Sequence, residues 1–464
     1  MKRNLKVAIL QALVVLLFAS LYLYNNLDGS SVHRFVTVAQ SCFSLSNSTT
    51  GKYRNRNDSE VYLDLRLGRT GVSKVHRHPE LAVVHKRLLN ETAASDGPRK
   101  SSLRTSLGDA APSVYIKEMP KEFYHTDEGF DLRNSSLKKI LIWNEGYGSK
   151  TMGFGFGQAP FKLARCEVDT CFVTGNRTLV PFIDIDAIIF HFRTTNPRDM
   201  PRRRYDRQRW IFEEVESSSY IYQDIRIYNG VFNWTMTYRR DSDIVYTYGR
   251  VYANETQNLS SRKENYAAGK TKMAAWFVSN CRSHSRREKF VKALQTHFHV
   301  DIFGKCGPKK CPHKYGQKCY KLLETDYKFY LSFENSVCKD YVTEKLFNIL
   351  KYNIVPVVYG LADYDKIAPP GSYINALKFP DVRSLAEYLK YLDGNDTAYN
   401  DYFRWKGHYT VDTGWSNTAQ PFCELCKKLH EDRAPKVYED MKAWFVTKGS
   451  CKTLKIKDWL KNLK

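Results

Sequence analysis

Acidic residues are scarce relative to basic ones in this 464-residue chain. There are 49 Asp and Glu against 72 Lys and Arg, which leaves a formal net charge of +23. Such an excess suits nucleic acid, an anionic membrane surface or phosphate-bearing small molecules, and much of it is ordinary surface charge. The chain lacks zinc-finger spacing, a basic leucine zipper and an RNA-recognition signature. We therefore expect no nucleic-acid partner.

Long apolar runs are equally scarce, because only residues 7–24 reach the length needed to span a bilayer. Lys2, Arg3 and Lys6 precede this run, which predicts a cytosolic tail at 1–6 and a lumenal remainder. A cleaved signal peptide is the alternative, but the run is long for one and no small-x-small cleavage site follows it. The sequence favours a single-pass type II signal anchor.

Residues 25–112 have little apolar periodicity and are rich in Ser, Asn, Thr, Arg and Lys. This composition predicts a largely disordered stem, with a small helix near residues 80–89 as one local exception. We expect the folded part to begin at about residue 113.

Sequons and cysteines both indicate an oxidising, lumenal compartment. The candidate N-glycosylation sites are Asn47, Asn57, Asn90, Asn134, Asn176, Asn233, Asn254, Asn258 and Asn395. The 11 cysteines leave at least one unpaired within the chain, and disulfides are the default for the rest. Cys423-Glu-Leu-Cys426 resembles a redox motif or half a zinc site, but no thioredoxin-like context or matching second half accompanies it.

The stretch 329–360 has the pattern of a strand, a polar loop, a helix and a second strand. In such βαβ units, ligands bind outside the carboxyl ends of the strands, where helix N-termini attract anions. The polar cluster Glu334-Asn335-Ser336, Asp340-Tyr341 and Glu344-Lys345 falls at that edge. Its residue types suit a sugar nucleotide, although a Glu-Lys pair taken alone is usually solvated surface.

Earlier strands are predicted at residues 138–143 and 187–191, and the fold class is α/β. A glycine-rich segment, 144–157, follows the first strand. Its spacing is not that of a dinucleotide-binding G-x-G-x-x-G loop, so we interpret it as a flexible loop near an acceptor.

Several motifs together resemble the inverting α1,3-fucosyltransferases. The family pattern F-x-L-x-F-E-N-S, D-Y-[IV]-T-E-K and V-P-V-V is present from Phe329 to Val358. Residues 232–243 and 272–280 are similar to further family stretches, so the resemblance covers roughly 138–450. It implies two Rossmann-like domains facing a cleft, the GT-B type. The expected divisions are an N-terminal acceptor-side domain at 113–268, a GDP-fucose-binding domain at 269–410 and a tail, 411–464, that returns to the first domain.

The resemblance also implies the activity. We expect transfer of fucose from GDP-fucose, with inversion, to the 3-hydroxyl of GlcNAc in glycoprotein glycans, at the Golgi membrane. The acceptor stays open between the N-glycan core GlcNAc and an antennal or GalNAc-capped GlcNAc. The alternatives are a non-catalytic membrane-bound lectin and a glycosyltransferase with a different acceptor sugar.

The residues that match the family's site are Arg287 and Lys345 for the diphosphate, Tyr341 and Glu344 for the ribose or fucose, and Asn335 for the loop or donor. The same resemblance assigns the catalytic base to Glu216, in a family Glu-Ser-Pro in which this chain has Ser218 instead of Pro. Glu213 and Glu214 are its neighbours, and an acidic loop exposed to water is the alternative interpretation.

In the family, a C-x-x-C near the end pairs with two upstream cysteines. This implies that Cys166 and Cys171 bond to Cys423 and Cys426, with the local pairs as the alternative. We expect Cys306, Cys311, Cys319 and Cys338 to bond among themselves. Asp184-Ile-Asp186 and Asp241-Ser-Asp243 look like metal-binding D-x-D motifs, but a donor site built on Lys and Arg can neutralise the diphosphate. We predict no metal site and no required cofactor, and leave stimulation by a divalent cation open.

Overall fold

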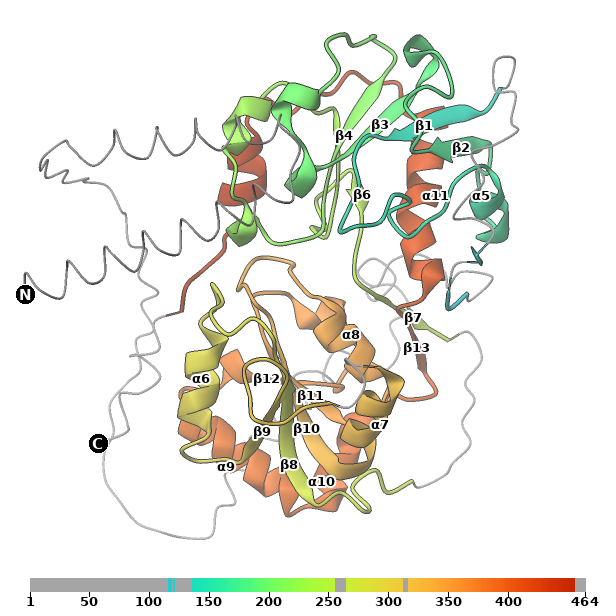
Figure 1. Ribbon diagram of the computed structural model, residues 1–464. Helices are drawn as coiled ribbons and strands as arrows, with labels where there is room; N and C mark the ends of the chain where they lie inside the picture. Colours follow the sequence, from blue (N-terminus) through green and yellow to red (C-terminus); the bar gives the residue numbers. More distant parts are fainter. Residues whose placement is uncertain (1–115, 119, 122–135, 255–263, 312–315, 455–464) are drawn as a thin grey trace, which may run out of the picture. The chain divides into compact units, whose positions relative to one another are not determined.

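The computed structural model describes residues 116–118, 120–121, 136–254, 264–311 and 316–454 (Figure 1). The predicted anchor, the stem and the small helix near residues 80–89 lie outside these ranges, as do Cys42, Asn47, Asn57, Asn90, Asn134 and Asn258. Within them, no helix combines the length and the apolar character needed to cross a bilayer.

The first sheet has six parallel strands in the order β2-β1-β3-β4-β5-β6. These strands are β1 (Lys138–Ile142), β2 (Cys171–Thr174), β3 (Ala187–His191), β4 (Arg209–Glu214), β5 (Trp234–Thr237) and β6 (Ile244–Val245). β3 is buried along its whole length, as expected for a central strand of a parallel sheet covered on both faces. β4 includes the aromatic segment Arg209-Trp-Ile-Phe212 and extends two residues beyond it, so Glu213 and Glu214 belong to the strand.

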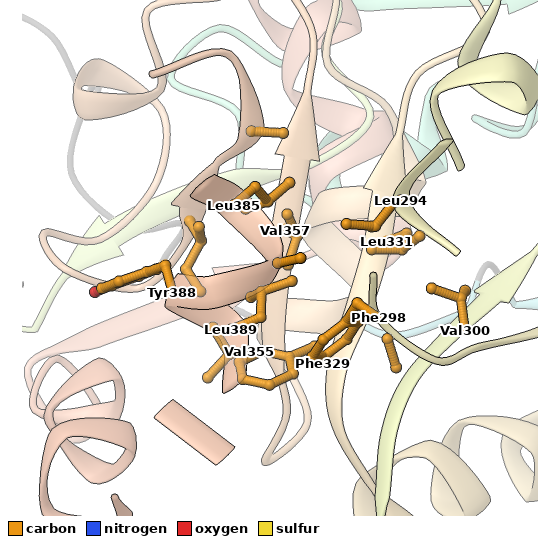
Figure 2. Close-up of a cluster of buried hydrophobic side chains, with 14 of the residues drawn as sticks. Leu294, Phe298, Val300, Phe329, Leu331, Val355, Val357, Leu385, Tyr388 and Leu389 are labelled. Carbon is orange, nitrogen blue, oxygen red and sulfur yellow. The ribbon is translucent and has the colours of Figure 1, made fainter. Parts of the chain in front are cut away.

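The second sheet has five parallel strands in the order β12-β11-β10-β8-β9. They are β8 (Lys272–Phe277), β9 (Val300–Phe303), β10 (Tyr327–Phe333), β11 (Val355–Tyr359) and β12 (Ile374–Asn375). Figure 2 shows Phe329, Leu331, Val355 and Val357 of this sheet packed against helix side chains such as Leu389. The α/β class predicted from the sequence is therefore correct, with two separate parallel sheets.

Helices cover the faces of both sheets. They are α5 (Ala159–Leu163), α6 (Arg287–Leu294), α7 (Gln317–Asp326), α8 (Glu344–Leu350), α9 (Val382–Asp393), α10 (Asp396–Asn400), α11 (Trp415–Glu431) and a π-helix, Lys442–Thr447. α9 begins where Asp381 accepts a hydrogen bond from the Ser384 amide at 2.7 Å, a typical N-cap.

The end of the chain packs on both faces of the first sheet. Side chains of α11 join Ile140 and Ile142 in one hydrophobic cluster, whereas Phe445 of the π-helix joins Leu141 in another. Neighbouring residues of β1 point to opposite faces, which explains the division. Just before α11, β13 (Tyr409–Asp412) pairs antiparallel with β7 (Arg250–Ala253).

Five disulfides are present among the described residues. Cys166 bonds to Cys423 and Cys171 to Cys426, the long-range pairing that the resemblance implies, and they tie α11 to the start of the first sheet. The other three are Cys281–Cys306, Cys311–Cys319 and Cys338–Cys451. The expectation that Cys306, Cys311, Cys319 and Cys338 bond among themselves is therefore wrong for Cys306 and Cys338. Their partners come from the loop after β8 and from the end of the chain.

One predicted glycosylation site is incompatible with the fold. Asn233 is buried; its side-chain oxygen accepts from the Trp210 amide at 2.8 Å and its Nδ2 donates to the Lys436 carbonyl at 2.8 Å. Asn254 and Asn395 are partly buried and hydrogen-bonded, whereas Asn176 is exposed. Asn233 joins β4 to the chain after α11, and its buried Nδ2, in contact with the Lys436 carbonyl, leaves no room for a glycan.

The two sheets have the same strand order. When the strands of each sheet are counted along the chain, the first strand lies between the second and the third. In sheets of this kind the connections diverge between the first and third strands, and ligands bind beyond the carboxyl ends there. For the first sheet, this point lies between β1 and β3. For the second, it lies between β8 and β10. The topology thus singles out the loops that follow these four strands.

Candidate active site

In the second sheet, the loops after β8 and β10 are bonded to each other. Ser285 donates through its hydroxyl to the Glu334 carbonyl at 2.7 Å and through its amide to the Asn335 carbonyl at 3.0 Å. Arg287, at the start of α6, donates from Nη1 to the Phe333 carbonyl at 2.5 Å. Its guanidinium is buried, and its Nε has no hydrogen-bond partner. Burial lowers the pKa of Arg287 from its ordinary value.

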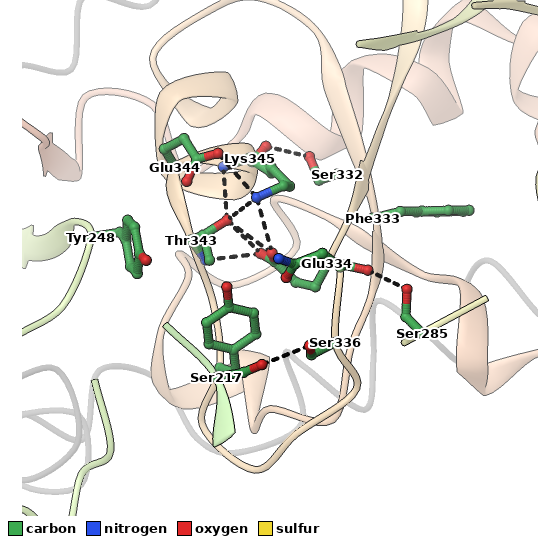
Figure 3. A network of polar contacts seen from close by, with 12 residues as sticks. Ser217, Tyr248, Ser285, Ser332, Phe333, Glu334, Ser336, Thr343, Glu344 and Lys345 are labelled. Atoms are coloured by element: carbon green, nitrogen blue, oxygen red, sulfur yellow. Dashed lines mark hydrogen bonds and ion pairs between the residues drawn. The ribbon is translucent and has the colours of Figure 1, made fainter. Parts of the chain in front are cut away.

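Lys345 is the cation of a compact polar cluster at the N-terminus of α8 (Figure 3). Its Nζ lies 2.8 Å from the Thr343 hydroxyl, 3.0 Å from Glu344 and 3.5 Å from the buried carboxylate of Glu334. Burial lowers the pKa of Lys345, but Glu334 and then Glu344 outweigh it, so the pKa is raised. Lys345 is therefore a permanent positive charge at a helix N-terminus, as binding of an anion requires.

Glu334 holds Thr343, the residue that precedes α8, in place within this cluster. Its carboxylate accepts the Thr343 amide at 2.8 Å and the Thr343 hydroxyl at 2.8 and 3.1 Å. Burial raises the pKa of Glu334, and the neighbouring Lys345 partly offsets that rise. The sequence places Glu334 in the polar loop but gives no sign that its side chain points back to cap α8.

Glu216 follows β4 of the first sheet and meets the loop after β10. Its Oε1 accepts from the Tyr341 hydroxyl, from Asn335 Nδ2 at 3.3 Å and from the Ser217 amide at 3.1 Å. Arg193 Nη1 lies 3.8 Å from Oε2, and the side chain is 18% exposed. A partly exposed carboxylate held in one orientation by several donors can accept a proton from a bound hydroxyl.

Glu214 lies directly behind this carboxylate. Its Oε1 accepts from the Glu216 amide at 2.8 Å and from the Tyr147 hydroxyl at 3.0 Å. Burial, with a further contribution from Glu213, raises the pKa of Glu214 to about 7. Tyr147 belongs to the glycine-rich segment after β1, so this segment contacts the site through Glu214.

Glu213 forms a buried pair with His191, at 2.6 Å between Oε2 and Nδ1. The two residues stand opposite each other in the β3–β4 register. Burial lowers the pKa of His191, but the hydrogen bond and charge of Glu213 outweigh it and the pKa is raised. The interpretation of Glu213 and Glu214 as an exposed acidic loop is wrong, because both are buried strand residues.

The predicted site residues thus fall into three groups. Tyr341 and Asn335 both donate to Glu216. Glu344 and Lys345 share the α8 cluster, and Arg287 donates to the Phe333 carbonyl. Sequence reasoning missed Glu334, Glu214 and Tyr147 as supporting residues. Only the raised density of Glu in 213–216 hinted at one of them.

The carboxylates of the two D-x-D segments have structural partners. Asp186 accepts from the Lys139 amide at 2.9 Å, Asp241 pairs with Arg239, and Asp243 bonds to Thr235 and Tyr438. In the described part of the chain, the one group with metal-ligand spacing is Cys171, Cys426 and His430. Its two sulfurs are joined in a disulfide and are not available as thiolate ligands.

Two family models match the chain. The glycosyltransferase family 10 (fucosyltransferase) C-terminal model covers residues 267–444, and the fucosyltransferase N-terminal model covers residues 135–249. Glycoprotein 3-alpha-L-fucosyltransferase A of Drosophila melanogaster is 38% identical over 327 residues, 69% of this chain and 62% of that protein. The match thus spans less than two thirds of that relative. Alpha-(1,3)-fucosyltransferase C of the same organism is 36% identical over 348 residues, 68% of this chain and 79% of that protein.

A crystal structure of an alpha1,3-fucosyltransferase with GDP-fucose aligns with 68% of this chain and 95% of its own, at 17% identity and a TM-score of 0.44.

Proposed function

This chain belongs to glycosyltransferase family 10, the fucosyltransferases, and we propose that it transfers fucose from GDP-fucose to the 3-hydroxyl of an N-acetylglucosamine in glycoprotein glycans. The transfer inverts the anomeric centre. The observation that carries the proposal is the contact of Glu216 with Tyr341 and Asn335, because it joins a candidate base to the loop of the candidate donor site.

The donor half binds the diphosphate through positive charge. Lys345 is protonated at any physiological pH and sits at the N-terminus of α8, the positive end of the helix dipole. Glu344 is half exposed, so a diphosphate can displace its carboxylate from Lys345 without disturbing the buried Glu334. Arg287 has an unpartnered Nε behind this cluster and adds a second charge. Both charges stabilise GDP as it leaves.

Glu216 supplies the base. In one displacement, the acceptor O3 attacks the anomeric carbon as the bond to the GDP oxygen breaks, and the proton of O3 passes to the Glu216 carboxylate. The Tyr341 hydroxyl and the Asn335 amide donate to Oε1, which leaves Oε2 as the atom available to the acceptor. Arg193 Nη1, 3.8 Å from Oε2, places a positive charge beside the carboxylate.

The two sheets correspond to the two domains of a GT-B glycosyltransferase, with the acceptor on the side of the first sheet and GDP-fucose on the second. The sequence of residues 1–24 supports a type II signal anchor in the Golgi membrane, with the catalytic part in the lumen. The five disulfides agree with an oxidising lumen. Lys345 and Arg287 supply charge that a metal provides in other transferases, so we propose that no cofactor is required.

Glycoprotein is the acceptor class that we favour, since one relative is named for it. The experiment incubates the full-length chain, purified in detergent, with GDP-fucose and a panel of N-glycans: a core chitobiose, an antennal LacNAc and a GalNAc-capped GlcNAc. Linkage analysis of the product is expected to give α1,3-fucose on GlcNAc, with GDP released in equal amount. Binding of GDP-fucose without GDP release from any acceptor would instead identify a lectin, and fucose on another sugar would identify a different transferase.

A further inference from the structure

The end of the chain reaches both halves of the candidate active site. The π-helix Lys442–Thr447 packs through Trp444 and Phe445 on a cluster that contains Phe212 of the first sheet. Seven residues after the helix ends, Leu454 packs against the core of the second sheet. The segment between them, Gly449 to Lys452, runs beside the loop that follows β10.

Three contacts fasten this segment to that loop. Cys451 bonds to Cys338, the Lys339 amide donates to the Gly449 carbonyl at 2.9 Å, and the Lys452 amide donates to the Val337 carbonyl at 2.8 Å. The attachment lies between Asn335 and Tyr341, the two residues whose side chains donate to Glu216. The conformation of the Glu216 donors therefore depends on the end of the chain.

The serine run after Glu216 makes the matching contacts from the other side. Ser217 donates to the Ser336 hydroxyl at 2.6 Å. Ser218 lies 3.1 Å from the Cys451 sulfur and Ser219 lies 3.6 Å from the Cys338 sulfur; a disulfide sulfur has no proton, so each serine is the donor. Ser218 replaces the proline of the related pattern, and proline could not make this bond.

The backbone at Gly449 fits this packing closely. A Cβ built there would lie 2.5 Å from the Phe445 carbonyl oxygen and 3.0 Å from the Ser218 hydroxyl. Any larger residue must move the segment away from Ser218. Glycine at this position keeps the segment against the serine run.

We propose that Ser217–Ser219, the Cys338–Cys451 disulfide and the segment Gly449–Lys452 form a clasp that positions Glu216 and its donors Tyr341 and Asn335 for proton transfer. The clasp residues are positioning residues, because they act through Glu216 and touch neither substrate. The predicted effect on kcat rests on the proposed function. The predicted ordering of residues 214–220 by the clasp is independent of that function.

The test compares full-length Cys338→Ser/Cys451→Ser with Cys311→Ser/Cys319→Ser, which removes a disulfide at the start of α7 instead. We expect the first variant to lose about 10- to 100-fold in kcat, since a shift of about 1 Å in a catalytic group costs up to that factor. The Kd for inorganic pyrophosphate, a probe of the diphosphate subsite alone, should change less than about threefold, because Lys345 and Arg287 lie outside the clasp. The control pair should lower Tm while keeping kcat within about twofold.

Smaller changes test the same proposal if the disulfide variant does not fold. Ser218→Ala and Gly449→Ala should each lower kcat by about threefold or more. Lys448→Ala should not, since this exposed lysine lies just outside the clasp and its backbone has an ordinary helical conformation. Retention of full kcat by Ser218→Ala and Gly449→Ala, or an equal loss in both disulfide variants, would overturn the clasp.

Amide hydrogen exchange supplies a readout that needs no activity. Peptides covering residues 214–220 should exchange faster in Cys338→Ser/Cys451→Ser than in the control pair, because the loop loses its attachment. Equal exchange in the two variants argues against the clasp. If the wild-type protein is inactive toward every acceptor, yet the two disulfide variants still differ in exchange, the proposed function is overturned and the clasp stands.

Discussion

Replacing Glu216 with Gln tests the assignment of the catalytic base. Glutamine keeps the shape of the side chain and an oxygen that can accept from Tyr341, but its amide cannot take a proton. Removal of a general base typically costs about 10²–10⁴ in rate, or roughly 3–5 kcal/mol in activation free energy. Lys345 and Arg287 do not depend on this carboxylate in the structure, so we expect kcat to fall by that factor while the Kd for GDP-fucose stays nearly unchanged.

Glu214→Gln is the matched control, two residues away. With a pKa of about 7, the Glu214 carboxyl is already close to half neutral at pH 7, and Gln can still accept from Tyr147 and from the Glu216 amide. We expect its kcat to change by less than about fivefold, a small loss of hydrogen-bond strength. GDP release measured under single-turnover conditions, with donor binding by calorimetry, checks both variants. If the Glu214 variant lost all turnover while the Glu216 variant kept it, the base would have been assigned to the wrong carboxylate.

Three further predictions follow from the same contacts. Lys345→Ala should weaken GDP binding by about 1.5–3 kcal/mol, or roughly 10- to 150-fold, since it removes a charge-assisted bond; calorimetry checks this against the exposed Lys366→Ala, and equal affinities would contradict it. Glu214→Gln should raise Tm at pH 8. The pKa of Glu214 is raised from 4.5 to about 7 in the folded protein, so the carboxylate destabilises the fold by on the order of 3 kcal/mol when it is ionised in both the folded and the unfolded protein. Thermal unfolding between pH 5 and 8 should show this gain in Tm shrinking as the pH falls toward the pKa of the unfolded chain, and a gain that is constant with pH would refute the explanation. Mass spectrometry of glycopeptides should find Asn233 unoccupied, and a glycan there in folded, active protein would contradict its burial.

The strands of the two sheets could be predicted because their signals are local. Residues 187–191 and 329–333 are short, apolar and bounded by polar loops, and both are strands in the structure, the second two residues longer at its start. The polar loop after β10 was recognisable for the same reason, together with its motif. Local patterns carry this much because a parallel strand buried on both faces has to be apolar throughout.

The supporting residues could not be predicted because they depend on register and on contacts between distant segments. His191 meets Glu213 only because β3 and β4 pair with those residues opposite each other. A run such as Glu213-Glu214 inside a strand contradicts β propensity. The buried His191 pairs with Glu213, and the Tyr147 hydroxyl and the Glu216 amide donate to Glu214. Likewise, Cys338 was expected to bond to a nearby cysteine, but its partner, Cys451, lies 113 residues away in sequence.

The surroundings of Glu216 follow from the parallel direction of the strands in both sheets. The carboxyl ends of parallel strands meet at one edge of a sheet; Glu216 follows β4 at this edge of the first sheet, and its side-chain donors Asn335 and Tyr341 follow β10 in the second. A base on one sheet with donors on the other has a geometry that neither sheet fixes alone. A covalent bond from the last segment of the chain to the donor loop supplies the missing constraint. Ser218 can therefore stand here in place of the family's proline. Proline would stiffen the loop, whereas the Ser218 hydroxyl holds it by its contact with the Cys451 sulfur of that disulfide.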